Sequence, residues 1–368
     1  MRKPVTLFLS GDVMSGRGID QILPHPSAPQ LFEPSMRSAL GYVELAEAAA
    51  GPIPRPVAFD YVWGDALAEL ARRHPSARIV NLETAVTRSD EAWPHKGIHY
   101  RMHPDNVPCL AAAHIDCCTL ANNHVLDWGR VGLKETLTAL HDANIRTAGA
   151  GCDAKEAQAP ATVRQAGGSA IQIFAFGMPS SGVPPEWQAR RTKAGVNWVE
   201  DLSPRSVQAV ACQISAHWRP GNIVIASIHW GGNWGYEISD GEREFAHQLI
   251  EKAGVHLIHG HSSHHVKAIE VHRGKLILYG CGDLLNDYEG IHGYESFRGD
   301  LSLMYFPTVD AESGALLGLS MVPMQMRRLR IQRAPSAAVE WLWRTLDREC
   351  SRLGTRIARE ADDTLELT

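Results

Sequence analysis

The residues most able to do chemistry form a histidine cluster that follows a short apolar run. Leu257-Ile258 leads into His259-Gly260-His261-Ser262-Ser263-His264-His265, which holds four histidines and a glycine within seven residues. Neutral imidazole is a common ligand of divalent transition metals, and a cluster at a strand end can direct several rings to one point. Gly260 would let the backbone turn sharply there. A solvated polar loop is the simpler alternative, but the combination favours a metal site.

Ligand-type side chains also follow other predicted strands. They are Asp12, Glu83, Asn123, His124 and His229, together with His261 and His264 of the cluster. Because strand ends converge on one edge of a sheet, residues far apart in the sequence can meet there. Carboxylate, amide and imidazole ligands together suit Mn, Fe or Zn and, with more oxygen, Ca or Mg. We therefore expect one or two divalent metal ions, and a shared carboxylate could bridge two of them.

Strands that alternate with amphipathic helices predict an α/β fold that would position these residues. Strands are expected at 6–9, 77–83, 114–120, 171–176, 223–228, 275–279, 301–306 and 316–321, and helices at 63–73, 132–143 and 242–253. Residues 1–330 are predicted to form a single domain. Its loop insertions are expected at about 20–60, 84–108 and 179–200, and a C-terminal helix at 335–360 is expected to pack on it.

The composition is that of an ordinary globular protein. The chain has 368 residues, of which 44% are hydrophobic and 21% charged, and its net charge of −5 is spread without a basic stripe. This argues against nucleic-acid binding and against attraction to anionic lipid. The apolar run at 5–9 is too short for a signal peptide, and no apolar run is long enough for a membrane span. Seven cysteines without a Cys-x-x-Cys spacing predict neither a disulfide framework nor a zinc ribbon. We expect a soluble, cytoplasmic protein.

Five motifs follow one another along the chain. They are Gly11-Asp12-x-Met14-x-Gly16-Arg17, Asn81-Leu82-Glu83, Asn122-Asn123-His124-x-x-Asp127, His229-Trp230-Gly231 and Gly260-His261-x-x-His264. In this order they resemble the motifs of the CapA group, which belongs to the calcineurin-like metallophosphoesterase superfamily. The resemblance covers about residues 5–306. It implies a metallophosphatase-like four-layer α/β/β/α sandwich with a metal site at one edge of two sheets.

The resemblance also implies roles for individual residues. One metal would be held by Asp12, Glu83 and His264. The other would be held by Glu83, Asn123, His229 and His261. His124 would be the general acid/base beside them.

The chain departs from the family pattern in three places. The superfamily usually has a histidine where this chain has Met14, and a thioether is a poor ligand for a hard cation. Ser262 and Ser263 interrupt the usual Gly-His-His-Pro-His motif. Asp283 stands where the group commonly has asparagine, which adds a carboxylate. One metal site would therefore be weak, or filled by Ca or Mg with water.

Three classes of function are open to such a protein. One is phosphoester or amide hydrolysis, and another is chemistry on a peptide-like substrate, since CapA relatives are associated with poly-γ-glutamate. A non-catalytic role in capsule export fits least well, because a structural role gives no reason for so many ligand-type residues. We favour epimerisation of a peptide residue, as in proteins resembling CapA that act on lasso-peptide precursors. His124 would act there with Asp283 or His292 as the second acid/base.

Basic and aromatic residues near the motifs are candidates for substrate binding. They are Arg17, Trp93, Arg101, Trp128, Trp230 and Trp234. The tryptophans could form a pocket for a peptide side chain, although ordinary packing around a sheet edge would explain them equally well. The sequence leaves the metal, the substrate and the oligomeric state open.

Overall fold

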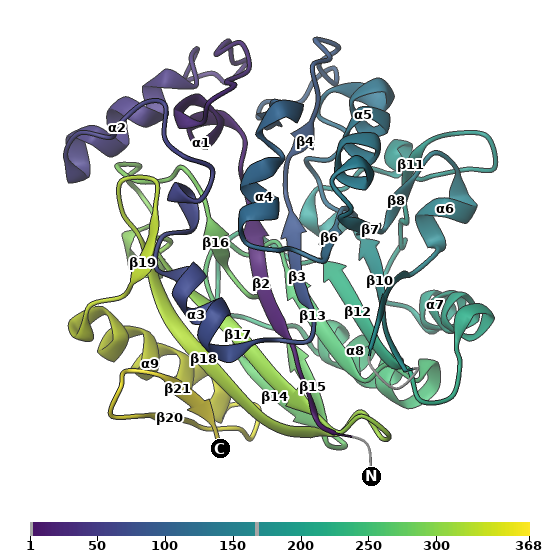
Figure 1. The fold of residues 1–368 in the computed structure, drawn as a ribbon. Helices are drawn as coiled ribbons and strands as arrows, with labels where there is room; N and C mark the ends of the chain where they lie inside the picture. The colour runs from purple at the N-terminus through teal and green to yellow at the C-terminus, as the bar shows by residue number, and fades with distance from the viewer. Residues whose placement is uncertain (1–2, 166–168) are drawn as a thin grey trace.

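Two mixed β-sheets form the centre of the molecule, in a computed structural model that describes residues 3–165 and 169–368 (Figure 1). The larger sheet holds, in spatial order, β20 (Ile357–Arg359), β21 (Leu365–Leu367), β18 (Leu316–Met326), β17 (Leu301–Val309), β2 (Phe8–Val13), β3 (Arg78–Leu82), β6 (Cys117–Thr119) and β7 (Arg146–Ala148). Three short strands join this sheet. β1 (Val5–Thr6) pairs with β17, β16 (Asp283–Leu285) pairs with β2, and β19 (Ile331–Arg333) pairs with β18.

The smaller sheet holds β14 (Ile269–His272), β15 (Lys275–Leu278), β13 (Leu257–His261), β12 (Ile223–His229), β10 (Ala170–Gly177) and β9 (Ala161–Arg164). Its strands β10, β12, β13 and β15 are parallel, as are β2, β3, β6 and β7 of the larger sheet. The carboxyl ends of neighbouring strands therefore lie together, which is where such folds place ligand-binding groups.

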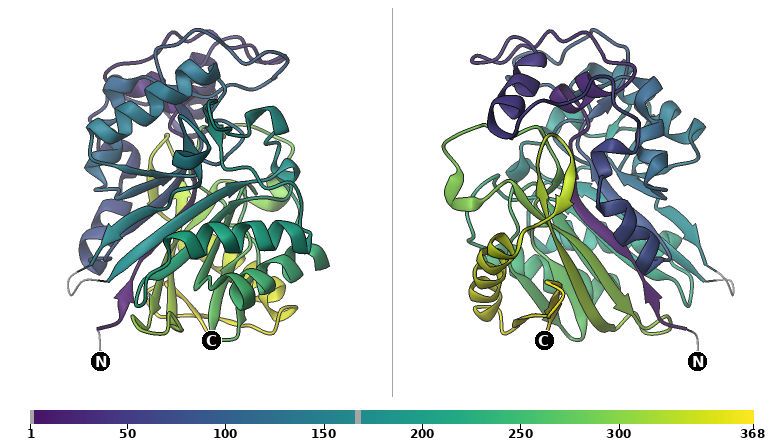
Figure 2. Two further views of the ribbon diagram at one scale, coloured as in Figure 1. Left: turned by 90° about the vertical axis from the view of Figure 1, so that its right-hand side faces the viewer. Right: turned by 60° about the vertical axis from the view of Figure 1, so that its left-hand side comes forward.

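Helices cover the outer face of each sheet and complete four layers. The helices α3 (Ala66–Arg73), α4 (Pro108–Ala112) and α5 (Gly129–Asp142) pack on the larger sheet. The smaller sheet is covered by α7 (Pro204–His217) and α8 (Asp240–Ala253), seen at the front of the left view in Figure 2. The predicted α/β/β/α sandwich is thus confirmed.

The core between the sheets follows from the alternation of side chains along each strand. Leu7 and Leu9 face this inner core with Ile225 and Leu257 of the smaller sheet, whereas Phe8 faces the outer helices. Helix α9 (Ser336–Ser351) packs against β14 and contributes to the same inner core.

Loop segments lie beyond the carboxyl ends of the strands. Figure 1 shows α1 (Arg17–Ile22) and α2 (Leu40–Ala50) at the upper edge, in the region where the sequence predicted an insertion. The predicted insertion at 84–108 contains the strand pair β4 (Ala85–Val86) and β5 (Arg101–Met102). The insertion at 179–200 contains β11 (Gly195–Val196), which pairs with β8 (Ala150–Gly151) outside it. Helix α6 (Ala154–Gln158) follows β8, and single 3₁₀ turns lie at Tyr61–Trp63, Pro104–Asn106, Pro179–Ser181, Pro185–Trp187 and Glu295–Phe297.

Several element boundaries differ from the prediction. The first strand continues past Leu9 to Val13, because Gly11 has no side chain to obstruct the carbonyl oxygen of Gly282, which lies 1.7 Å from the ideal position of a Cβ. Asp12 therefore lies within a strand rather than after it. The C-terminal helix ends at Ser351 instead of 360, since the chain then forms β20 and β21, and β21 pairs with β18. Helix α7 was not predicted.

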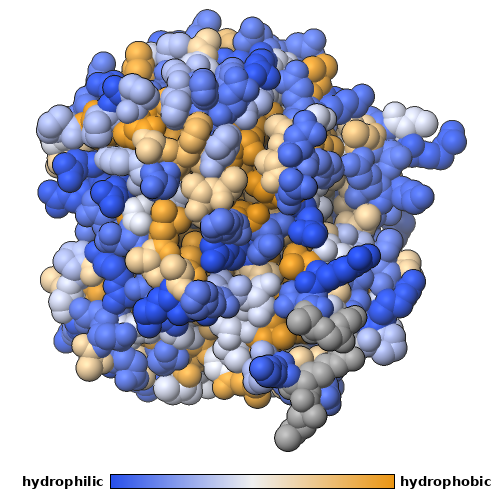
Figure 3. All heavy atoms as spheres, viewed as in Figure 1, coloured by the Kyte–Doolittle hydropathy of each residue, from blue (hydrophilic) through white to orange (hydrophobic). Residues whose placement is uncertain are grey.

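The surface seen in Figure 3 is mostly hydrophilic, with apolar side chains exposed in small groups near its centre. No helix in the described part of the chain is long and apolar enough to cross a membrane.

Candidate metal centre

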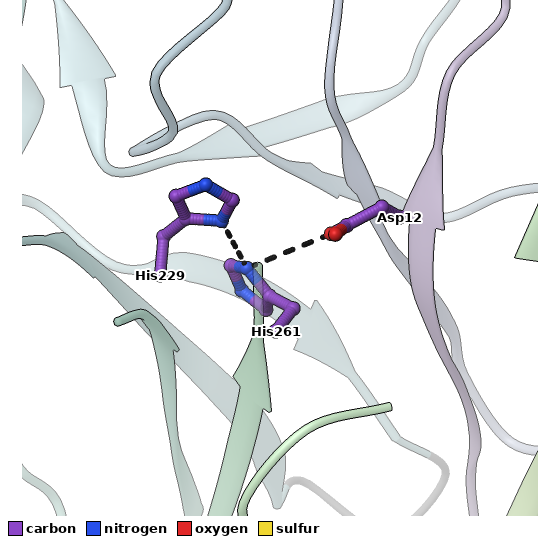
Figure 4. Close-up of side chains that lie close together, drawn as sticks. All are labelled: Asp12, His229 and His261. Atoms are coloured by element: carbon purple, nitrogen blue, oxygen red, sulfur yellow. Dashed lines mark hydrogen bonds and ion pairs between the residues drawn. The ribbon is translucent and has the colours of Figure 1, made fainter. Parts of the chain in front are cut away.

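Three predicted ligands meet where the two sheets face each other. His229 and His261 are register neighbours at the ends of the parallel strands β12 and β13, and their Nδ1 atoms lie 2.8 Å apart. Asp12 reaches them from β2, with 3.8 Å between its Oδ1 and His261 Nδ1 (Figure 4). Each of the three offers a ligand atom within 4.8 Å of the others. All three side chains are buried.

A second group of three shares Asp12. Strand β16 pairs with β2 so that Asp283 lies directly beside Asp12, and Asp283 Oδ1 lies 3.0 Å from His264 Nδ1. His264 reaches this place because the chain turns at Ser262, which has a φ of 104° and donates its backbone N–H to Asp12. The turn predicted at Gly260 is absent from the described backbone: that residue continues β13, where a Cβ would meet a neighbouring strand's carbonyl.

The remaining predicted ligands lie beside these groups. Asn123 Oδ1 lies 3.0 Å from His229 Nε2. Glu83 Oε1 lies 4.0 Å from the same nitrogen, whereas Glu83 Oε2 is buried without a hydrogen-bond partner among the described residues. The structure thus brings all six predicted metal ligands to one place. Asp12, rather than Glu83, is common to both groups of three.

The electrostatics of this cluster suit cations. Burial and the charge of Asp283 raise the pKa of Asp12 to about 7, and burial with the neighbouring Asp12 raises the pKa of Glu83 well above its usual value. Burial lowers the pKa values of His229 and His261 well below the ordinary range, so both rings are neutral, as metal ligands must be. Buried carboxylates are costly unless a cation compensates them. The donor set and the unpartnered Glu83 oxygen therefore fit divalent metal ions.

His124 lies beside the cluster and is fixed by a buried carboxylate. Its Nδ1 lies 2.7 Å from Asp127 Oδ2, and its Nε2 lies 3.7 Å from Glu83 Oε1. Asp127 also forms an ion pair with Lys96 at 2.7 Å and accepts the backbone N–H of Tyr100. Burial and the Lys96 charge lower the pKa of His124 to about 4. Burial opposes the ionisation of Asp127, but Lys96 and His124 lower its pKa below the usual value.

A cavity of about 670 Å³ lies against one side of the centre, and its lining includes His264, Asn233, Trp234, Tyr288 and Arg17. His264 connects the two, because it belongs to the second ligand group and also faces the cavity. Its Nε2 lies 3.4 Å from the Tyr288 hydroxyl. This volume is typical of pockets that enclose a small organic ligand.

Arg17 links the segments around this cavity. Its guanidinium pairs with Asp287 and, at 2.9 Å, with Glu33, and it lies 3.8 Å from the centre of the Tyr42 ring and 4.3 Å from that of Tyr100. These contacts compensate the charge of Arg17 and give it a structural role, and its predicted substrate-binding role stays a prediction.

The four predicted pocket tryptophans lie in different surroundings. Trp234 lines the cavity and stacks on Tyr294 with 4.2 Å between ring centres. Trp230 does not line it: the ring is buried in the core under α8, stacks on Tyr279 and donates to that residue's carbonyl. The structure places Trp230 in the core rather than at the cavity, and its predicted substrate-binding role stays a prediction.

Trp93, Trp128 and Arg101 also serve packing. Trp93 contacts Trp187 edge to face at 5.4 Å. Trp128 is buried and lies under the Arg101 guanidinium, 3.9 Å from ring centre to Cζ. Arg101 donates to the carbonyls of Ser89 and Ala28, so its described contacts join the 84–108 segment to the loop before α2.

The two predicted partners of His124 differ in position. Asp283 lies in the second ligand group. His292 lies in an exposed loop, where its Nδ1 pairs with Glu295 Oε1 at 3.2 Å and 87% of its side chain is accessible. The structure pairs His292 with a surface carboxylate rather than with a group of the centre, and its predicted catalytic role stays a prediction.

Sequence reasoning missed three residues at the site. Asp127 could have been found, since it lies three residues after His124 in a recognised motif. Lys96 and Tyr288 gave no signal, because each lies in a loop whose path depends on the packing of the whole molecule.

Comparisons with known proteins show the family of the chain. Residues 6–288 match the family model described as "Bacterial capsule synthesis protein PGA_cap". The chain is 48% identical to a probable polyglutamine synthesis accessory protein of Mycobacterium tuberculosis (strain ATCC 25618 / H37Rv), over 99% of this chain and 96% of that protein. It is 27% identical to the PGA biosynthesis protein CapA of Bacillus subtilis (strain 168), over 75% of this chain and 62% of the relative. The capsule biosynthesis protein CapA of Bacillus anthracis is 20% identical, over 77% of this chain and 60% of that protein. The chain therefore belongs to the PGA_cap family, which includes the CapA proteins.

Proposed function

We propose that this protein is a metal-dependent hydrolase that cleaves amide bonds of a glutamate polymer during polymer synthesis. The observation that carries the proposal is the buried cluster of carboxylates and imidazoles, which has a cavity on the side of His264 and His124 fixed beside Glu83. The substrate class comes from the relatives, which are named for polyglutamine synthesis, PGA biosynthesis and capsule biosynthesis. Polyglutamine and poly-γ-glutamate are both joined by amide bonds, whereas the capsule biosynthesis name specifies no polymer.

Two sets of residues would hold divalent ions. The first set is Asp12, Asn123, His229 and His261, and the second is Asp12, His264 and Asp283, with Glu83 between them. When bound, such ions polarise a substrate carbonyl and lower the pKa of water.

His124 supplies the proton transfer that amide cleavage needs. The Asp127 carboxylate accepts the Nδ1 proton, which leaves Nε2 as the basic nitrogen on the side of Glu83. A neutral His124 can accept a proton at Nε2 from the attacking water and donate it to the departing nitrogen. Tyr100 packs edge-on against the ring at 4.6 Å, so the imidazole has little freedom to rotate.

The predicted epimerisation has less support than hydrolysis. The names of the reported relatives mention neither an epimerase nor a hydrolase, so the choice between the two reactions rests on the site. Epimerisation also needs an acid and a base on opposite faces of one Cα. Of the predicted second partners, Asp283 belongs to a ligand group and His292 is exposed. A non-catalytic role would leave the buried carboxylates unexplained.

The proposal is tested with a poly-γ-glutamate oligomer, a generic phosphodiester and a choice of divalent metals. We expect shortening of the oligomer in oxygen-labelled water, with one label in each new carboxyl group, and loss of this activity in His124→Ala. Deuterium uptake at Cα without cleavage, in deuterated water, would instead show epimerisation. Turnover of the phosphodiester alone would overturn the amide substrate, and no turnover with any metal would overturn the enzyme assignment.

A further inference from the structure

The second ligand group contains a carboxylate that the sequence pattern did not place among the metal ligands. Asp283 lies on β16, directly beside Asp12 of β2 in the parallel register. Its side chain is buried, and Oδ1 lies 3.0 Å from His264 Nδ1. These three residues offer ligand atoms that all lie within 4.8 Å of one another.

The first motif of this chain lacks one metal ligand that the superfamily usually has. Met14 lies two residues after Asp12, is completely buried and offers only a thioether, which binds hard cations poorly. Without Asp283, the described residues of the second group would reduce to Asp12 and His264, with Glu83 near them.

Asp283 has no lysine or arginine partner among its described hydrogen bonds and ion pairs. Its Oδ2 accepts a hydrogen bond from the Asn286 amide at 3.0 Å, and its other described partner is His264. Asp12 and Glu83 add two more buried carboxylates, and Glu83 Oε2 has no hydrogen-bond partner in the described structure. Buried carboxylates this close together must be compensated by a proton or by a cation, and the ligand atoms here are spaced to hold a cation.

We infer that Asp283 is a ligand of the second metal ion and not an acid or base of the reaction. It replaces the ligand that the first motif lacks, because this chain has Met14 where the superfamily usually has a histidine. Its position on a strand paired with β2 fixes the carboxylate against Asp12 and His264. Oxygen donors dominate this group, whereas imidazoles dominate the group of His229 and His261. The second site therefore selects a harder cation such as Mn²⁺ or Mg²⁺.

The inference rests on the metal centre of the proposed function, but its test measures metal binding and not turnover. Purified chain, stripped with a chelator, is titrated with Mn²⁺ by calorimetry, and bound metal is counted by elemental analysis. We expect two ions per chain in the unmodified protein. In Asp283→Asn, the weaker ion should be lost or bound more than about 10-fold less tightly, while the other is retained.

The matched control is Asp127→Asn, which removes the carboxylate of the other buried histidine–aspartate pair. It should keep both ions, because Asp127 is held by Lys96 and Tyr100 outside the ligand groups. Asp283→Glu keeps the charge and should keep two ions at reduced affinity, which covers the case in which Asp283→Asn fails to fold. Unchanged number and affinity of ions in Asp283→Asn would overturn the inference, and so would fewer than two ions in the unmodified protein. Failure of polymer cleavage would leave these binding results standing.

Discussion

Two histidine–aspartate pairs flank the metal centre with similar geometry. His124 Nδ1 lies 2.7 Å from Asp127, and His264 Nδ1 lies 3.0 Å from Asp283. All four side chains are buried. The pairs differ in what else contacts the carboxylate. Asp127 has an ammonium partner in Lys96, whereas Asp283 faces a further carboxylate on the neighbouring strand.

This difference assigns different roles to the Asp127 and Asp283 carboxylates, which the residue types alone do not distinguish. A carboxylate that already has a cation of the chain beside it can orient an imidazole and accept its proton. A buried carboxylate beside another carboxylate must be compensated by a proton or by a cation from outside the chain. Burial and Lys96 lower the pKa of His124, whereas Asp283 raises that of His264 although burial opposes it. The pKa values of the two histidines therefore shift in opposite directions because their charged neighbours differ.

The largest effect is expected from the pair that carries proton transfer. His124→Ala should lower kcat of polymer cleavage by roughly 100- to 10,000-fold, which is the usual contribution of a general acid/base. Bound metal should remain unchanged, because His124 lies outside the two ligand groups of three. The matched control is His292→Ala, since that exposed histidine pairs only with Glu295 among its described ion pairs. Equal activity of both variants would remove His124 from the mechanism.

A smaller effect is expected from Lys96, which positions Asp127 without reaching the ligand groups. Lys96→Met should lower kcat by roughly 10-fold with little change in KM, because Asp127 loses the partner that fixes it. Lys96→Arg should restore most of the activity by keeping the positive charge. A rise in KM with unchanged kcat would show that Lys96 binds substrate instead.

The sequence predicted the strand-borne part of the site well. Asp12, His229 and His261 follow apolar runs whose burial fixes both the strand and its register, so their convergence followed from the sheet. The α/β/β/α order of the layers was predicted from the family resemblance that the five motifs carry. The helix α7 was missed because its apolar positions Val207, Val210 and Ile214 are few among polar residues.

The loop-borne part of the site could not be predicted in the same way. His292 and Lys96 both lie in polar loops near motifs, yet the first is exposed and the second reaches a buried carboxylate. Trp230 and Trp234 are four residues apart, and only the second lines the cavity within the described structure. Loop direction depends on packing against distant segments, and local sequence contains little of that information.

A third carboxylate–histidine pair, remote from the two ligand groups, shows what such a pair does without a cation site. Glu270 lies 3.1 Å from His247 and accepts hydrogen bonds from Arg243 at 2.8 Å and from Tyr279 at 2.7 Å. Burial opposes its ionisation, but these hydrogen bonds lower the pKa of Glu270 below the ordinary value. The pair is therefore expected to contribute to stability alone.

The smallest effect is accordingly expected from Glu270→Gln, with metal content and turnover unchanged. The variant should lose about 1–3 kcal/mol of unfolding free energy at pH 7, because hydrogen bonds to a charged group are replaced by neutral ones. The depressed pKa of Glu270 makes this contribution fully present above the unfolded-state pKa of about 4.3 and progressively lost as pH falls through the lower folded value. Denaturant unfolding from pH 7 to pH 3 should therefore show the two proteins converging in acid. A difference that stays constant over this range would mean that the ionised carboxylate contributes nothing, and that Glu270 stabilises the fold by packing.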